Sequence, residues 1–165
     1  MNILTVGRIA PVKNYEVLIE AARILKSRGV DFSVTIIGAP ALEQDKAYEQ
    51  RIRNESAGLN FHFLGKKAHR ELPEIYRSYD IFVHMSQTGS LDKTMLEAMA
   101  CGMYVVSSND AAKNILPKMR IFSPHDAQGL ADAIQHRHDE GFDARRYVVE
   151  HHDLKKLIEK ISLLL

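Results

Sequence analysis

Short apolar runs alternate with longer segments of helical periodicity along almost the whole chain. Strands are predicted from β-branched and aromatic residues at 3–6, 32–37, 61–64, 80–84, 103–107 and 119–122. Apolar positions at helical spacing predict helices at 14–28, 42–56, 69–76, 94–101, 126–138, 142–150 and 153–165, and residues 109–117 are expected to be less regular, with one helical turn. Alternation of this kind predicts a doubly wound, Rossmann-like α/β fold, with about six parallel strands and helices on both faces. No repeat or linker interrupts residues 1–165, so we expect a single domain.

The stretch from Ser86 to Gly102 combines a polar loop with an apolar helix. Ser90 or Asp92 is expected to cap that helix, because both side chains can accept hydrogen bonds from its first amides. Free amides at a helix N-terminus favour anions such as phosphate. Glu97 is the only charged residue between positions 94 and 101, so we expect a buried carboxylate that needs partners. This stretch therefore indicates a phosphate site with a carboxylate behind it.

A doubly wound sheet binds its ligands beyond the carboxyl ends of its strands. The loops at that edge are 7–14, 38–41, 65–69, 84–92 and 107–109. Arg8 and Lys13 lie in the first of them, and together a guanidinium and an ammonium suit a diphosphate. Taken alone, the two cations are better explained as ordinary surface charges, so their interpretation as phosphate ligands depends on the 86–102 stretch across the sheet.

Composition narrows the classes of protein. The 165 residues carry 22 Lys and Arg against 21 Asp and Glu, so the formal charge of +1 does not indicate a nucleic-acid binder. The single cysteine, Cys101, cannot form an internal disulfide and suits a reducing compartment, and we expect a cytoplasmic protein. The histidine pair His136 and His138 does not share a helix face, so no metal site is predicted.

Three separated segments resemble one known family. They are VGRIAPVKNYEVLIEAARIL at 6–25, FHFLGKKAHRELPEIYRSYDIFVHMS at 61–86 and LEAMACGMYVVSS at 96–108. In order and spacing they resemble the C-terminal, donor-binding half of GT-B retaining glycosyltransferases of the family 4 type, the glycosyl transferases of group 1. The resemblance implies a nucleotide-sugar donor, retaining hexosyl transfer to a sugar or lipid-linked acceptor, and no cofactor or essential metal.

The resemblance also implies roles for individual residues. Glu97 matches the second acid of the family's E-x7-E motif, which binds the nucleotide ribose, and Arg8 and Lys13 match its diphosphate ligands. No residue is assigned to catalysis. The full set expected to bind the donor is Gly7, Arg8, Lys13, Gly65, Lys66, Gly89, Ser90, Leu91, Asp92, Thr94 and Glu97, with Gly65 and Lys66 near the base.

Two departures from the family qualify these expectations. Gly89 stands where the first acid of E-x7-E belongs, and Gly89-Ser90-Leu91-Asp92 replaces the usual E-G-F-G. The family's N-terminal, acceptor-binding half is also absent, so we expect an excised domain, a truncated product or half of a split enzyme, with little activity alone. The alternatives are a non-catalytic nucleotide-binding or assembly module, or half of a GT-B sugar-nucleotide epimerase.

The last predicted helix, 153–165, has an apolar stripe beside a basic face. We expect it to pack on this domain or on the missing half. Peripheral membrane association of the full enzyme is the second reading, because an amphipathic basic helix also suits a membrane surface.

Overall fold

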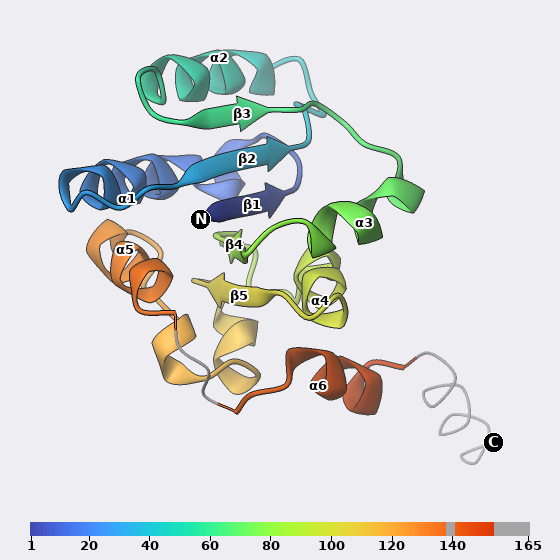
Figure 1. Cartoon of the computed structure of the whole chain (residues 1–165). Coiled ribbons are helices and arrows are strands. Elements are labelled where there is room, and N and C mark those ends of the chain that lie inside the picture. The colour runs from blue at the N-terminus through green and yellow to red at the C-terminus, as the bar shows by residue number, and fades with distance from the viewer. Residues whose placement is uncertain (138–140, 154–165) are drawn as a thin grey trace.

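The computed structural model describes residues 1–137 and 141–153, and its centre is a parallel sheet (Figure 1). The five strands are β1 (Asn2–Val6), β2 (Ser33–Ile37), β3 (Phe61–Phe63), β4 (Ile81–His84) and β5 (Tyr104–Ser107). Their order is β3-β2-β1-β4-β5. β1 pairs with β2 along its whole length, and Ile3 lies opposite Ile81 on β4. The chain therefore switches direction across the sheet between β1 and β4, which is where such folds bind ligands.

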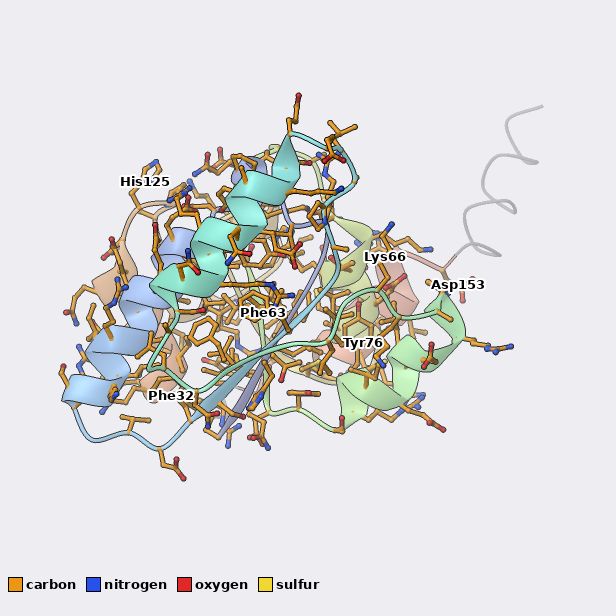
Figure 2. All side chains as sticks on the ribbon, turned by 90° about the horizontal axis from the view of Figure 1, so that it is seen from above. Phe32, Phe63, Lys66, Tyr76, His125 and Asp153 are labelled. Atoms are coloured by element: carbon orange, nitrogen blue, oxygen red, sulfur yellow. The ribbon has the colours of Figure 1, made fainter. Side chains whose placement is uncertain are left out.

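Helices cover both faces of the sheet, as the strand–helix alternation predicts. Within the described ranges the α-helices are α1 (Tyr15–Ser27), α2 (Asp45–Glu55), α3 (Leu72–Arg77), α4 (Lys93–Ala100), α5 (Ala127–Gln135) and α6 (Ala144–His151). Ile3 packs with α1, α2 and α5, whereas the next residue, Leu4, packs with α3, α4 and α6. Side chains fill the space between the sheet and these helices (Figure 2). The two cores follow from the alternation of side chains along each strand.

The predicted sixth strand at 119–122 is wrong. Residues Lys118–Arg120 form a 3-10 turn, and Ile121 makes only an isolated parallel bridge to Ser107. Met119 is 52% exposed, whereas Arg120 is buried with its guanidinium 4.0 Å from the centre of the Tyr104 ring. The strand was predicted from the apolar residues of this run, but the residue buried within it by stacking on an aromatic ring is Arg120.

Helix boundaries differ from the prediction by a few residues. α2 begins at Asp45 rather than at 42, and α6 begins at Ala144, where the Asp143 carboxylate accepts a hydrogen bond from the Arg146 amide at 2.8 Å. The segment expected to hold one irregular turn contains a 3-10 helix at Asp110–Asn114. The predicted terminal helix, like His138, lies outside the described residues except for Asp153.

Candidate functional site

The carboxyl edge of the sheet is held together by close backbone contacts. Gly7, at the end of β1, donates its amide to Ile37 at 2.9 Å, and Gly38 donates to the carbonyl of Gly65 at 2.9 Å. Gly38 has a positive φ of 146°, and a Cβ on it would lie 1.8 Å from the Gly7 carbonyl oxygen. Only glycine fits there. The loops after β1, β2 and β3 are therefore fixed side by side.

Lys13 connects the loop after β1 to the loop after β4. It ends a 3-10 turn at Pro11–Lys13, immediately before α1. Its ammonium group forms an ion pair with Asp92 and lies 3.3 Å from the Ser86 hydroxyl. The Gln87 amide also donates to the Val12 carbonyl at 3.1 Å. The structure thus brings Lys13 into contact with the loop of the 86–102 stretch. Lys13 and Asp92 are 79 residues apart in the sequence.

Asp92 occupies the N-cap position of α4, but its side chain does not cap the helix. The predicted cap by Ser90 or Asp92 is therefore wrong. The Ser90 hydroxyl faces Thr88 at 3.2 Å, and the Asp92 carboxylate meets His84 Nε2 at 2.7 Å as well as Lys13. The hydrogen bond from His84 and the ammonium of Lys13 hold the pKa of Asp92 well below its usual range.

A buried chain of hydrogen bonds supports Asp92 from below. His84 is 4% exposed, and its Nδ1 lies 3.1 Å from the hydroxyl of the fully buried Ser107. The Asn109 amide donates to that hydroxyl at 3.1 Å. Because a carboxylate only accepts, the Nε2–H of His84 donates to Asp92, while the Ser107 hydroxyl is the partner of Nδ1. Both ring nitrogens of His84 therefore have partners.

Asn109 fastens the loop that carries Asp92. Its side-chain amide donates to the carbonyls of Ser86 at 3.2 Å and Ser90 at 3.0 Å, and its oxygen accepts from the Ala111 amide at 2.8 Å. The hydroxyl of neighbouring Ser108 is buried and has no hydrogen-bond partner among the described residues. The loop is therefore anchored at its two ends, while Gly89 at its tip is exposed with a φ of 70°.

Glu97 lies one turn into α4 and faces α3 rather than solvent. One carboxylate oxygen meets His69 Nε2 at 2.8 Å, and the other accepts from the Tyr76 hydroxyl at 3.1 Å. Lys93 approaches within 3.5 Å. The Glu97 side chain is 19% exposed, so the expected carboxylate is mostly buried and has partners. Burial, followed by the charge of Glu97, raises the pKa of Tyr76.

The remaining predicted residues surround this cluster at the same edge. Arg8 and Lys66 are exposed, and within the described residues no ion pair engages either side chain. Gly65 follows β3 with a φ of 67°, and the side chains of Leu91 and Thr94 are partly buried. The structure joins Lys13 directly to Asp92 and places Glu97 on the helix that follows. The binding roles of all these residues stay predictions.

The sequence pattern did not single out five side chains that belong to this cluster: His84, Ser107, Asn109, His69 and Tyr76. His84 is the last residue of an otherwise apolar strand, and a histidine there, followed eight positions later by an acid, was the available signal. Asn109 follows β5 at the same edge. Tyr76 resembled an ordinary core residue, because its ring is 1% exposed and only its hydroxyl reaches Glu97.

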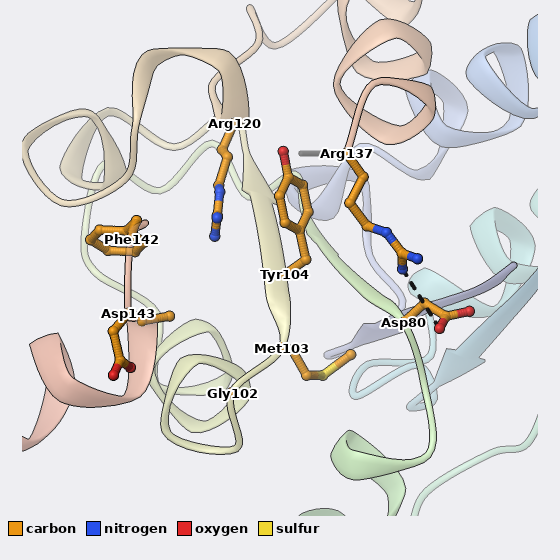
Figure 3. Close-up of a pocket in the computed structure, with 9 residues that line it drawn as sticks. Asp80, Gly102, Met103, Tyr104, Arg120, Arg137, Phe142 and Asp143 are labelled. Atoms are coloured by element: carbon orange, nitrogen blue, oxygen red, sulfur yellow. Dashed lines mark ion pairs between the residues drawn. The ribbon is translucent and has the colours of Figure 1, made fainter. Parts of the chain in front are cut away.

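One hollow within the described part of the chain lies at the opposite edge of the sheet (Figure 3). It measures about 400 Å³ and lies at the amino ends of β4 and β5, lined by Tyr104, Arg120, Arg137 and Phe142 among others. Arg137 pairs there with Asp80 at 3.6 Å. None of the predicted donor residues lines it. Glu97 instead borders an apolar hollow of about 170 Å³ with His69, Tyr76 and Cys101. We place the site by chemistry and topology rather than by volume.

Among the described residues, no three histidine, cysteine, aspartate or glutamate side chains lie close enough together to hold a metal ion. None of the helices within that part of the chain is long and apolar enough to cross a membrane. Independence from metal stays a prediction.

Comparisons with solved structures show the same fold. A structure from Anabaena, Alr3699/HepE in complex with UDP and glucose, superposes with a TM-score of 0.82 at 18% identity, over 99% of this chain and 47% of that one. The C-terminal domain of a glycosyl transferase group 1 family protein (LpcC) from Francisella tularensis gives a TM-score of 0.75 at 25% identity, over 93% and 86% of the two chains. The fold is therefore the Rossmann-like α/β fold of GT-B glycosyltransferases.

Sequence comparisons give the family. A D-inositol 3-phosphate glycosyltransferase from Arthrobacter sp. (strain FB24) is 36% identical over 112 residues, which are 65% of this chain and 26% of that protein. Mannosylfructose-phosphate synthase from Agrobacterium fabrum (strain C58 / ATCC 33970) is 28% identical over 106 residues, 61% and 23% of the two. The chain thus spans about a quarter of the length of these relatives. The model of the family "Glycosyl transferases group 1" matches residues 2–136, and the chain belongs to that family.

Proposed function

We propose that the chain binds the nucleoside diphosphate of a sugar-nucleotide donor at the carboxyl edge of its sheet. In this proposal it serves as the donor half of a retaining glycosyltransferase that moves a hexosyl group to a sugar or lipid-linked acceptor. One observation carries the proposal: Lys13 after β1 meets the loop after β4 at the point where the strand order reverses.

The diphosphate would lie between Arg8, Lys13 and the first amides of α4. Arg8 is exposed at the end of β1, so its planar guanidinium is available for two parallel hydrogen bonds to phosphate. The first-turn amides of α4 have no intrahelical acceptor and present positive ends to the same region. These groups would also stabilise the charge that develops on the diphosphate as it leaves the sugar.

The ribose would bind at Glu97. Tyr76 holds one carboxylate oxygen from the buried side, whereas the other faces His69, which is 69% exposed. A ribose diol can replace the His69 contact without disturbing Tyr76. The base would then lie toward Gly65 and Lys66, which follow β3 at the same edge. Neither assignment requires a metal ion or a cofactor.

The comparisons support donor binding in general terms. The Anabaena structures of this fold carry UDP, and in one case UDP-glucose. The Arthrobacter relative is named a glycosyltransferase and the Agrobacterium relative a mannosylfructose-phosphate synthase, yet this chain spans only about a quarter of each. We therefore expect this chain alone to bind donor and to transfer little, in a cytoplasmic setting, until an acceptor-binding half is supplied.

Binding is tested with a thermal-shift and calorimetry panel of nucleoside diphosphates and sugar nucleotides. At one hundred times its Kd, a ligand adds about 2.7 kcal/mol to the free energy of unfolding. Arg8→Ala should weaken the shift. Arg53→Ala, which removes an arginine that pairs with Glu49 on α2 and stacks on the Phe63 ring, should not. A folded wild-type chain that responds to no ligand in the panel would contradict the proposal.

The ribose assignment has a sharper test. If Glu97 binds the diol, Glu97→Gln should reduce the preference for a ribonucleoside diphosphate over its 2′-deoxy form. Glu49→Gln is the matched control, because the Glu49 side chain is 22% exposed and also lies on a helix. An unchanged preference in Glu97→Gln would remove Glu97 from the ribose site while leaving the diphosphate site intact.

A non-catalytic nucleotide-binding module is the second candidate. Gly89 supports it, because no acid stands where the family has one near the transferred sugar, and its φ of 70° is one that side chains rarely adopt. Adding the acceptor-binding half of a relative distinguishes the glycosyltransferase from the non-catalytic module. Transfer from a sugar nucleotide favours the enzyme, whereas tight nucleotide binding without transfer or hydrolysis favours the module.

A further inference from the structure

Lys13, one of the two cations assigned to the diphosphate, already has an anionic partner. Asp92 pairs with it and stands where the resembling family's E-G-F-G run ends in glycine. The two side chains are 18% and 25% exposed, so solvent screens their interaction only in part. The chain therefore places its own carboxylate at a position where a donor's diphosphate would be expected.

We propose that Asp92 is a specificity-determining residue that competes with the diphosphate for Lys13. The inference rests on the proposed function, since it concerns the same site. Its carboxylate acts as an internal counter-ion, and phosphate gains Lys13 only by displacing it. Asp92 thereby sets how strongly the site holds a nucleoside diphosphate, both when donor binds and when the product leaves.

The N-terminus of α4, which also attracts phosphate to this position, is partly neutralised by Asp92 as well. Asp92 is the N-cap residue of α4, where the helix dipole favours a negative charge. Its carboxylate lies at the positive end of the helix without capping any amide. Lys13 and the helix terminus are thus both partly neutralised before any ligand arrives.

The hydrogen bonds that hold Asp92 in place maintain its competition with phosphate for Lys13. His84 holds the carboxylate at 2.7 Å and is itself fixed by Ser107, which accepts from the Asn109 amide. These partners are buried, so Asp92 stays near the α4 terminus when Lys13 turns toward a ligand. His84 leaves the negative charge on Asp92, whose pKa lies well below its usual range because of the hydrogen bond from His84 and the ammonium of Lys13. A bound diphosphate then experiences like-charge repulsion.

The test compares the binding of inorganic pyrophosphate and of UDP by calorimetry at low salt. Asp92→Asn keeps the size and the hydrogen bond to His84 but removes the charge, and we expect both ligands to bind about tenfold tighter, which is about 1.4 kcal/mol. Asp110→Asn removes the same charge from a carboxylate that is 77% exposed and paired with Lys113, and should change little. Asp92→Ser provides a second charge-removing variant if the asparagine variant folds poorly.

A double-mutant cycle shows whether the effect passes through Lys13. In a Lys13→Met background, Asp92→Asn should give much less than the tenfold gain, because no cation remains to be released. Equal gains in both backgrounds would overturn the proposal, as would a pyrophosphate affinity unchanged by Asp92→Asn and Asp92→Ser. Weaker binding in both variants would overturn it too, and would make Asp92 a ligand of the donor.

Failure of this inference and failure of the proposed function are distinguishable. Wild-type binding of UDP with no gain in Asp92→Asn leaves the function standing and overturns the inference. A gain for pyrophosphate without UDP binding in any variant supports the inference and contradicts the nucleotide site. Absence of binding by either ligand to every folded variant overturns both.

Discussion

Replacing Asp92 by asparagine should destabilise the fold at neutral pH. The substitution removes the ion pair with Lys13 and weakens the 2.7 Å hydrogen bond from His84. Hydrogen bonds to charged groups contribute about 1.5–3 kcal/mol. Asparagine retains an acceptor for His84, and Lys13 retains Ser86 at 3.3 Å. We therefore expect a loss of about 2 kcal/mol in the free energy of unfolding at pH 7.

The pH dependence of this loss has a definite sign. Because the folded pKa of Asp92 lies below its unfolded value, its stabilising contribution is complete above the ordinary carboxyl pKa of about 3.9 and is lost as the pH falls below it. The gap in stability between wild type and Asp92→Asn should be wide at pH 7 and shrink steadily below about pH 4. The variant has no carboxyl group at position 92 to protonate.

The assay is urea unfolding followed by circular dichroism at a series of pH values. Asp110→Asn is the control, because its exposed ion pair with Lys113 should contribute little at any pH. Combining Asp92→Asn with Lys13→Met should reveal a coupling of about 1 kcal/mol at pH 7. A gap that stays constant from pH 7 to pH 3, or an Asp92→Asn variant as stable as wild type, would refute the reasoning.

Three other substitutions test the backbone contact at Gly38, the loop contacts of Asn109 and the helix cap at Asp126. Gly38→Ala should cost more than about 2 kcal/mol in thermal unfolding, because its Cβ would meet the Gly7 carbonyl at 1.8 Å; normal stability would contradict this backbone geometry. Asn109→Ala should cost about 2 kcal/mol and speed hydrogen exchange of the 86–91 amides, since the Ser86 and Ser90 carbonyls lose their donor; unchanged exchange would show that the loop is held by other contacts. Asp126→Ala should cost about 1 kcal/mol by removing the α5 cap at Gly129, and Asp126→Asn should recover most of it.

Periodicity was sufficient to predict the layers of the fold but not its exceptions. Each strand and helix carries its own pattern of burial, so five strands and both helical faces follow from local sequence. The strand predicted at 119–122 was wrong because the burial of Arg120 depends on the Tyr104 ring, which belongs to β5. A pattern read within one segment cannot include a partner contributed by another.

The contacts of the candidate site depend even more on partners that other segments contribute. Lys13 and Asp92 were each singled out from the sequence, but their pairing depends on β4 lying beside β1, which local pattern does not specify. An acid at the start of a helix predicts a cap, yet a nearby ammonium and imidazole compete for the same carboxylate. The roles of His84 and Tyr76 depend likewise on neighbours brought in by strand order.

That strand order also determines when the site can form during synthesis. Within this sheet β1 is made before the other strands and pairs at once with the nearby β2, but its other edge waits for β4, which pairs with Ile3 and Leu4. Until residue 84 leaves the ribosome, the central strand exposes an apolar edge of unpaired amides and carbonyls, the kind of edge that recruits other chains. Slow translation of residues 38–80 should therefore favour aggregation, whereas binding residues fixed by the β1–β4 pair appear late and all together.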